Sequence, residues 1–187
     1  MAGTQRKRPD MDEYMMGIAL AVRARASCKG NRVGAVIALK SRIISTGYNG
    51  TPSGMPNCDD GGCERCGNRG RFPPGTGYDV CICVHAEQNA LLAAARFGIG
   101  VEAGLIYTTM RACFGCSKEL LQAKVAGVRF LHNWQHPDKG LQAEYLKVQS
   151  QFPQGVVRVQ VDDVDAAWAV STSRTSALET GHSVPGV

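Results

Sequence analysis

The feature that most constrains the fold is a pair of short motifs that must meet in space. An H-x-E motif at His85 and Glu87 opens one Ala- and Leu-rich segment, and a C-x-x-C motif at Cys113 and Cys116 opens a later one. One imidazole and two thiolates are ligands that zinc accepts, and a site with three protein ligands keeps a fourth position for water. The fold must therefore bring the starts of two predicted helices together around one metal.

The placement of these residues indicates a catalytic rather than a structural zinc. The positive ends of two helix dipoles favour thiolates and a bound hydroxide. Glu87 is not needed as a ligand, and we expect it to carry a proton from the zinc-bound water to the substrate. Each motif alone has a simpler reading, as a chance H-x-E or as a redox pair or half of a zinc knuckle. Both together, each opening a helix, favour the catalytic site.

The length and composition predict one ordinary globular domain in the cytoplasm. The chain has 187 residues, of which 44% are hydrophobic and 20% charged, as is usual for globular domains. No apolar run approaches the ~20 residues that a membrane helix needs. The basic N-terminus has no apolar segment behind it, so we predict no signal peptide. In the cytoplasm, the eight cysteines are expected to bind metal or act in catalysis.

The charge pattern indicates a small substrate. The net charge is +5, without the dense basic stripe that is typical of proteins that bind long nucleic acid. Aromatic residues make up only 6% of the chain, and none cluster with Arg or Lys. A modest positive balance is compatible with a small phosphorylated substrate. We expect neither long nucleic acid nor a membrane as partner.

Hydrophobic periodicity predicts alternating helices and strands. The expected helices cover 10–28, 85–97, 113–125 and 138–150, and the expected strands cover 33–39, 42–48, 105–109, 128–132 and 156–161. A Gly-, Pro- and Cys-rich insertion over 51–80 is too long to be a mere connection. Residues 171–187 are predicted to be a disordered tail. The order of elements predicts one α/β domain over 10–165, an αβα sandwich with a central mixed five-stranded sheet.

Four further stretches carry a family resemblance. They read VGAVI at 33–37, IISTGYNG at 43–50, NCDDGGC at 57–63 and HAEQNALL at 85–92. With the zinc motifs, they resemble the deoxycytidylate (dCMP) deaminases of the zinc-dependent cytidine-deaminase superfamily. The resemblance implies hydrolysis of dCMP to dUMP and ammonia by zinc-bound hydroxide, with Glu87 as proton shuttle, which supplies dUMP for thymidylate synthesis. One departure is Ala112, where the family usually has a proline that would pre-set the helix start.

The same resemblance implies the substrate contacts and partners. Asn49 would hydrogen-bond the sugar hydroxyl, the backbone around Gly50 and Thr51 would lie near the sugar-phosphate end, and Ala86 would also contact the substrate. The alternative for this stretch is a turn in which Asn49 adopts a left-handed backbone. The resemblance further implies a homo-oligomer, often a hexamer, that is activated by dCTP and inhibited by dTTP with magnesium. Arg111 is a candidate for a phosphate or effector contact.

The other six cysteines predict a second metal site. They are Cys28, Cys58, Cys63, Cys66, Cys81 and Cys83, and two pairs among them have metal-knuckle spacing. Some members of the family that this chain resembles have Cys or His at several of these positions. The resemblance implies a structural zinc on Cys28, Cys58, Cys63 and Cys81, with Cys66 or Cys83 as substitutes for a member. The alternative is a set of buried free thiols.

Two other functions stay open at this point. The chain could deaminate dCTP, a modified deoxycytidylate or a polynucleotide. It could also be a non-catalytic zinc-binding module, for instance in DNA uptake or assembly, that keeps the deaminase fold. The unligated Glu87 argues against such a module, which has no need for a carboxylate at that spacing.

Overall fold

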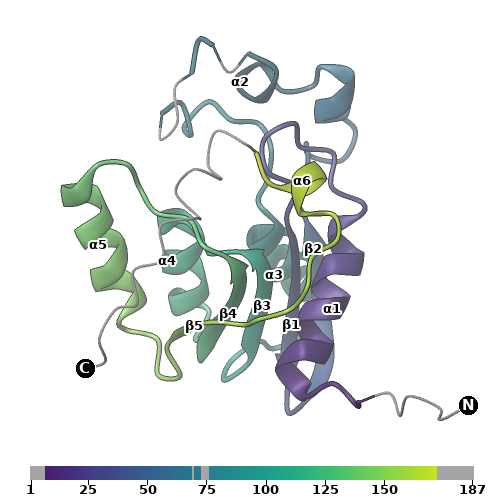
Figure 1. Ribbon diagram of the computed structural model, residues 1–187, viewed down its shortest axis with the longest axis vertical. Helices are drawn as coiled ribbons and strands as arrows, with labels where there is room; N and C mark the ends of the chain where they lie inside the picture. Colours follow the sequence, from purple (N-terminus) through teal and green to yellow (C-terminus); the bar gives the residue numbers. More distant parts are fainter. Residues whose placement is uncertain (1–6, 69, 73–75, 172–187) are drawn as a thin grey trace, which may run out of the picture.

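The computed structural model describes residues 7–68, 70–72 and 76–171. It contains a five-stranded sheet in the order β2-β1-β3-β4-β5 (Figure 1). The strands are β1 (Gly34–Leu39), β2 (Arg42–Tyr48), β3 (Leu105–Met110), β4 (Gly127–His132) and β5 (Val156–Arg158). β1 pairs antiparallel with β2 and β3, whereas β3, β4 and β5 are parallel. The predicted mixed five-stranded sheet is confirmed.

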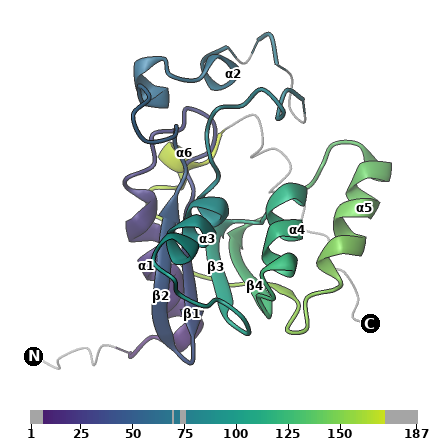
Figure 2. The same cartoon turned by 180° about the vertical axis from the view of Figure 1, so that it is seen from behind.

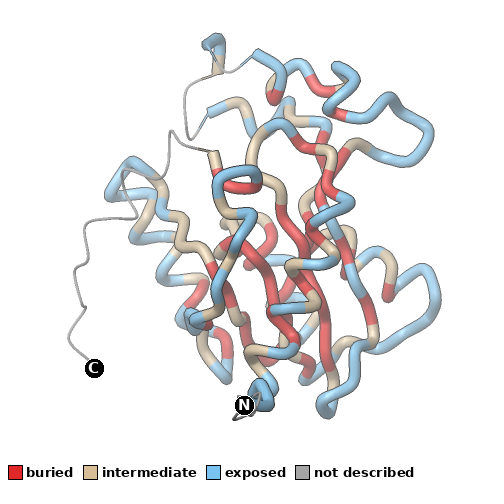
Figure 3. Tube along the Cα trace, turned by 45° about the vertical axis from the view of Figure 1, so that its right-hand side comes forward, coloured by how far each residue is buried: buried red, intermediate tan, exposed pale blue. Residues whose placement is uncertain are grey.

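Helices cover both faces of the sheet because both faces of β1 are apolar. Ala35 and Ile37 belong to the core under α3 (Ala86–Arg96) and α4 (Phe114–Gln122), with α5 (Lys139–Gln149) beside α4. Val36 and Ala38 pack under α1 (Met11–Arg23) on the opposite face. A strand that is buried on both faces has a continuous apolar sequence, since its side chains alternate between them. The result is the predicted αβα sandwich, seen from behind in Figure 2, with its buried strands in the centre in Figure 3.

Two glycines set how closely the helices approach the sheet. A Cβ on Gly34 in β1 would collide with the backbone of α1 at Ala19 and Arg23. A Cβ on Gly47 in β2 would collide with the backbone of α3 at Ala86. Neither glycine has a left-handed backbone, so both are explained by close approach. Gly47 therefore fixes the height of the helix that follows the H-x-E motif.

The cysteine-rich insertion is closed at its base. Gly50 and Val84 form an antiparallel bridge, in which the N–H of Val84 donates to the carbonyl of Gly50 over 2.8 Å. Between them, η1 (Cys58–Asp60) and α2 (Glu64–Gly67) are the only helical segments in the described part of the insertion. The insertion projects beyond one end of the sheet, above β2 in Figures 1 and 2.

The first predicted helix was too long. α1 ends at Arg23 rather than at residue 28, because the guanidinium of Arg23 pairs with Asp163 and the chain then turns to bring Cys28 to the insertion. Asp163 lies 2.6 Å from both Arg23 and His132. The segment after β5 therefore packs on the domain. Ala169, the last residue of α6 (Ala166–Ala169), and Val170, which follows it, belong to the core.

The remaining predicted elements are present with their ends shifted by at most three residues. The predicted tail falls outside the described residues from position 172 onward, and the backbone N–H of Ser171 donates to Asn31. No helix within the described ranges has the length and apolar character to cross a membrane.

Candidate active site

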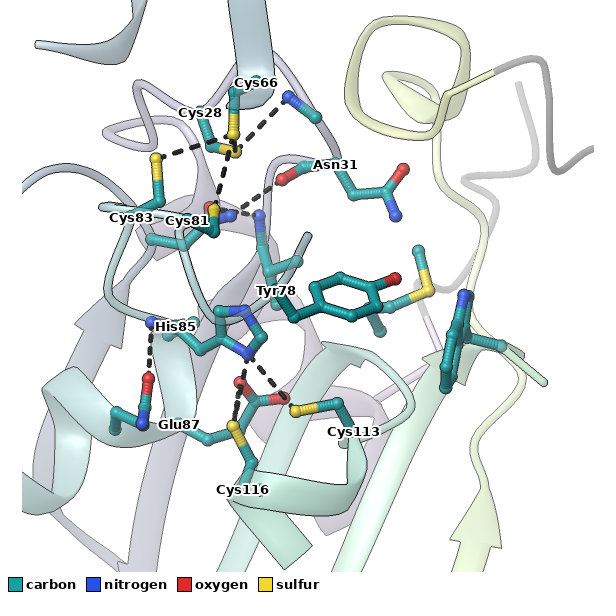
Figure 4. Close-up of a pocket in the computed structure, with 18 of the residues that line it drawn as sticks. Cys28, Asn31, Cys66, Tyr78, Cys81, Cys83, His85, Glu87, Cys113 and Cys116 are labelled. Atoms are coloured by element: carbon teal, nitrogen blue, oxygen red, sulfur yellow. Dashed lines mark hydrogen bonds between the residues drawn. The ribbon is translucent and has the colours of Figure 1, made fainter. Parts of the chain in front are cut away.

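His85, Cys113 and Cys116 meet where two helices begin. His85 is the residue before α3, Cys113 is the residue before α4, and Cys116 lies in the first turn of α4. The Nδ1 atom of His85 is 3.3 Å from the Sγ of Cys113 and 3.4 Å from that of Cys116 (Figure 4). The end of β3 leads directly into the start of α4, so the strand places the two thiols next to the histidine. The structure brings together the three ligands that the sequence predicts.

The spacing of these three atoms fits a zinc ion. Zn–N bonds of about 2.0–2.1 Å and Zn–S bonds of about 2.3 Å place neighbouring tetrahedral ligands roughly 3.5–3.8 Å apart. The observed separations of 3.3 and 3.4 Å need only slight expansion. No fourth His, Cys, Asp or Glu completes this group among the described residues. The site therefore has the ligand number of a catalytic centre, which keeps a position for water.

Glu87 lies beside the ligands on the first turn of α3. It is 4% exposed, and its Oε2 accepts a hydrogen bond from the Cys116 thiol over 3.7 Å. Its Oε1 lies 3.0 Å from the hydroxyl of Thr108, which also lies 3.0 Å from the carbonyl of Met110. A carboxyl held this close to the metal position without completing the ligand group is placed to move protons.

The surroundings shift the pKa values of the site. Burial raises the pKa of Glu87, which favours its protonated form. The hydrogen bond from Cys116 lowers the pKa of Cys113 to about 4, so a thiolate is available there. Burial alone would lower the pKa of His85, but its hydrogen bond with Cys113 and the nearby negative charges raise it to about 9. Zinc would displace the proton from the ring, since a metal ligand must be deprotonated.

A cavity of about 680 Å³ opens beside these residues. It has the size usual for small-molecule sites. Aromatic side chains form part of its wall: Trp134 follows β4, Tyr145 lies on α5, and their ring centroids are 5.3 Å apart. Tyr78, from the cysteine-rich insertion, lines the cavity together with His85 (Figure 4). Such rings offer flat apolar surfaces for a base or sugar.

The predicted substrate residues are placed unequally. Asn49 and Ala86 line the cavity, whereas Gly50 and Thr51 are not among its lining residues. The Asn49 side chain accepts from the N–H of Val33 over 2.8 Å and donates to the carbonyl of Asn31 over 2.7 Å. Asn49 does not have a left-handed backbone, so the turn alternative does not apply. The substrate roles of all four stay predictions.

Arg111, a candidate from the sequence, lies at the cavity wall, and three other residues near the site were missed. Arg111 lines the cavity, but its guanidinium is held by Gln149 and Asn133. Thr108 was missed, although a polar residue between Ile106 and Met110 on an apolar strand face is a usable signal. Tyr78 and Tyr145 were also missed, because their approach to the cavity depends on how the insertion and α5 fold.

The six other cysteines gather at the base of the insertion, but not in the predicted quartet. One group, whose sulfurs all lie within 4.8 Å of one another, contains Cys28, Cys58, Cys66 and Cys83. A second group contains Cys63, Cys66, Cys81 and Cys83. The predicted set of Cys28, Cys58, Cys63 and Cys81 is thus divided between two groups. The sequence could not show this, because the partners are chosen by the path of the loop.

Zinc-dependent nucleobase deaminases use this arrangement: one His and two Cys hold the metal, and a glutamate that is not a ligand carries protons. The family model for the cytidine and deoxycytidylate deaminase zinc-binding region matches residues 9–132. The chain belongs to this family.

Individual relatives agree with this assignment. The deoxycytidylate deaminase of Schizosaccharomyces pombe is 37% identical over 151 residues, which are 79% of this chain and 46% of the yeast protein. That of Mycobacterium phage D29 is 40% identical over 116 residues, which are 59% of this chain and 85% of the phage protein. The chain thus spans less than half of the yeast relative but most of the phage one.

A solved structure supports the fold. The dCMP deaminase from the cyanophage S-TIM5, in complex with dCMP and dUMP, superposes with a TM-score of 0.60 at 25% identity. The match covers 82% of this chain and 100% of the phage chain. The cytidine-deaminase-like fold predicted from the sequence is confirmed.

Proposed function

We propose that the protein hydrolyses dCMP to dUMP and ammonia, and so supplies dUMP for thymidylate synthesis. The observation that carries this proposal is a three-ligand His/Cys/Cys site with the buried Glu87 beside it, at the wall of a cavity of about 680 Å³. The names of the yeast and phage relatives support the substrate, as does the cyanophage structure that holds dCMP and dUMP.

His85, Cys113 and Cys116 would hold the metal. When bound, zinc supplies Lewis-acid chemistry that makes a water molecule nucleophilic near neutral pH. Glu87 takes a proton from that water as its oxygen bonds to C4 of the cytosine ring. Glu87 then delivers that proton to the ring nitrogen next to C4. It next takes the proton of the new C4 hydroxyl and passes it to the amino group, so that the C–N bond breaks, ammonia leaves and C4 keeps its oxygen as a carbonyl.

Thr108 suits both protonation states of Glu87. Its hydroxyl has one proton and two acceptors at 3.0 Å, Oε1 of Glu87 and the carbonyl of Met110. Facing an ionised Glu87, Thr108 donates to the carboxylate. Facing a protonated Glu87, it accepts from the acid and donates to Met110. Thr108 is therefore a positioning residue that holds the carboxyl throughout the cycle.

The cavity supports recognition of a nucleotide. Trp134 and Tyr145 offer aromatic surface, and Asn49 is a polar residue in the wall of the cavity. The Nδ2 of Asn49 uses one of its two protons on Asn31, and the other is proposed to donate to the sugar hydroxyl. Gly50 and Thr51 are proposed to lie at the sugar-phosphate end.

Further properties rest on the family resemblance. We propose a homohexamer, activation by dCTP and inhibition by dTTP with magnesium. A deaminase domain over 10–165 and a cytoplasmic location complete the proposal. All eight cysteines are free thiols in the structure, which is compatible with a reducing compartment. Structural metal binding at the base of the insertion, beside the catalytic site, is also proposed.

The test is turnover on a panel of substrates. Purified protein is offered dCMP, deoxycytidine, dCTP, 5-methyl-dCMP and single-stranded DNA, each with and without dCTP as effector, and the products are separated by chromatography. We expect dUMP from dCMP at the highest kcat/KM. Preferred turnover of dCTP or of the methylated nucleotide would keep the chemistry and change the substrate. No turnover of any substrate by zinc-loaded protein would favour the non-catalytic module.

A further inference from the structure

All six cysteines outside the active site belong to one cluster. Cys28 comes from the chain after α1, and the others come from the insertion and the residues just before His85. Five of the six are buried, and Cys81 is partly exposed. Figure 4 shows the sulfurs of Cys28, Cys66, Cys81 and Cys83 turned toward one another, apart from the active-site thiols. A cluster of six thiols exceeds the four that one tetrahedral ion can use.

The six sulfurs form two overlapping quartets. Cys28 and Cys58 occur only in the first quartet, and Cys63 and Cys81 occur only in the second. Cys66 and Cys83 occur in both. The two shared thiols therefore stand between two tetrahedral positions, each with two cysteines of its own.

The distances between the sulfurs match a zinc–thiolate geometry. A tetrahedron with Zn–S bonds of about 2.3 Å has sulfur–sulfur edges of roughly 3.8 Å. In the first quartet, Cys28 and Cys66 are 3.6 Å apart. In the second, Cys66 is 3.7 Å from Cys81, and Cys63 is 3.9 Å from Cys81. The two shared sulfurs, those of Cys66 and Cys83, are 3.9 Å apart, as expected for an edge common to both tetrahedra.

Neighbouring groups are arranged to stabilise thiolates. The backbone N–H of Lys29 points at the sulfur of Cys58 over 3.2 Å, and that of Gly30 points at Cys28 over 3.3 Å. Arg65 adjoins Cys66 in the chain and lines the same cavity as Cys66 and Cys81. Donors and a cation around sulfur are what a metal–thiolate cluster with net negative charge needs.

We propose that the six cysteines bind two zinc ions in a binuclear cluster, with Cys66 and Cys83 as bridging thiolates. Each ion then has four sulfur ligands, and no thiol of the cluster is unused. A single ion in either quartet would leave two cysteines of the other without a metal. With the catalytic site, the protein holds three zinc ions per chain.

The cluster fixes the active-site histidine from outside the active site. Cys83 lies two residues before His85, and the bridge between Gly50 and Val84 lies between them. Cross-links between Cys28, the insertion and Cys83 close the long loop at both ends and reduce its freedom before folding. The proposed role is to hold the start of α3, and hence His85, in place.

The test is the metal content of purified protein after dialysis, measured by plasma mass spectrometry against protein concentration. Three zinc ions per chain are expected for the wild type, and two for Cys113→Ala, which removes the catalytic site alone. The count in Cys113→Ala does not depend on any activity, so it stands even if the proposed function fails. Two ions in the wild type and one in Cys113→Ala would overturn the binuclear cluster in favour of a single structural zinc.

Matched cysteine variants distinguish bridging from terminal ligands. Cys63→Ala should lose one ion, because the quartet of Cys28, Cys58, Cys66 and Cys83 stays complete. Cys66→Ala should lose both ions of the cluster, because each loses a ligand. Loss of the same number of zinc ions in Cys63→Ala and Cys66→Ala would contradict the bridging role.

Substitution with ¹¹³Cd gives a readout on the unaltered chain, for use if Cys66→Ala fails to fold. Two cadmium resonances with all-sulfur chemical shifts and a mutual coupling are expected, since a shared thiolate connects the nuclei. A single such resonance, or a disulfide within the cluster found by mass spectrometry, would refute the proposal.

Discussion

Replacement of Thr108 by valine tests whether the carboxyl of Glu87 is held by a single hydroxyl. Thr108 is fully buried, and its oxygen lies 3.0 Å from Oε1 of Glu87. Valine has nearly the same shape but cannot form this bond. A hydrogen bond to a charged group contributes about 1.5–3 kcal/mol, and about 1.4 kcal/mol corresponds to a factor of ten in rate. If the bond acts in the transition state, we expect kcat to fall about 10- to 100-fold with little change in KM.

The adjacent Thr109 provides the matched control. It is equally buried, but its hydroxyl accepts from the N–H of Gly34 over 3.1 Å, on the face of β3 away from Glu87. Thr109→Val should lose similar stability in urea denaturation and keep its kcat, whereas Thr108→Ser should restore activity. Steady-state kinetics on dCMP with zinc-loaded proteins measures all three. Equal kcat values for the two valine variants would refute the positioning role of Thr108.

Two further predictions concern stability. Gly47→Ala should lower the free energy of unfolding by about 1–3 kcal/mol through overpacking against α3 and weaken zinc retention. Gly17 has open space around it, so the control Gly17→Ala should raise the free energy of unfolding by about 0.5–1 kcal/mol. Urea denaturation measures the stability of both variants, and dialysis measures their zinc retention. Asp163→Ala should cost about 3–5 kcal/mol because Arg23 keeps a buried, unpaired charge, against less than about 1 kcal/mol for the exposed Glu102→Ala. Burial opposes ionisation of Asp163, but hydrogen bonds from Arg23 and His132 lower its pKa to about 2. The greater stability of the wild type over Asp163→Ala should therefore disappear as the pH falls from about 4, the pKa in the unfolded chain, to about 2. An advantage that is the same at pH 2 and pH 6 would contradict the assignment.

The meeting of His85, Cys113 and Cys116 could be predicted from the sequence because the signals for it are local. His85 and Glu87 share one helix start, and Cys113 and Cys116 share another, so spacing alone places each pair on its element. The sheet follows in the same way from short apolar runs with clear turns between them. Where chemistry depends on residues that are close in the chain, pattern and structure agree.

The predictions failed where distant segments decide the outcome. α1 ends early because Arg23 finds Asp163, 140 positions further along the chain. The cysteine groups depend on the closure of the insertion between Gly50 and Val84, which no spacing rule reveals. Thr108 reaches Glu87 only through the packing of α3 on β3. Each of these contacts is set by tertiary structure rather than by local periodicity.

The central claim is that Glu87 beside a His/Cys/Cys zinc site deaminates dCMP. The most direct test compares the rate of dUMP formation by the wild type and by Glu87→Gln at equal zinc content. Glutamine keeps the size of the side chain but cannot shuttle a proton, so the account predicts a loss of about 10²–10⁴-fold in kcat with zinc retained. A Glu87→Gln protein within about tenfold of the wild-type rate, or a zinc-loaded wild type that forms no dUMP, would contradict it.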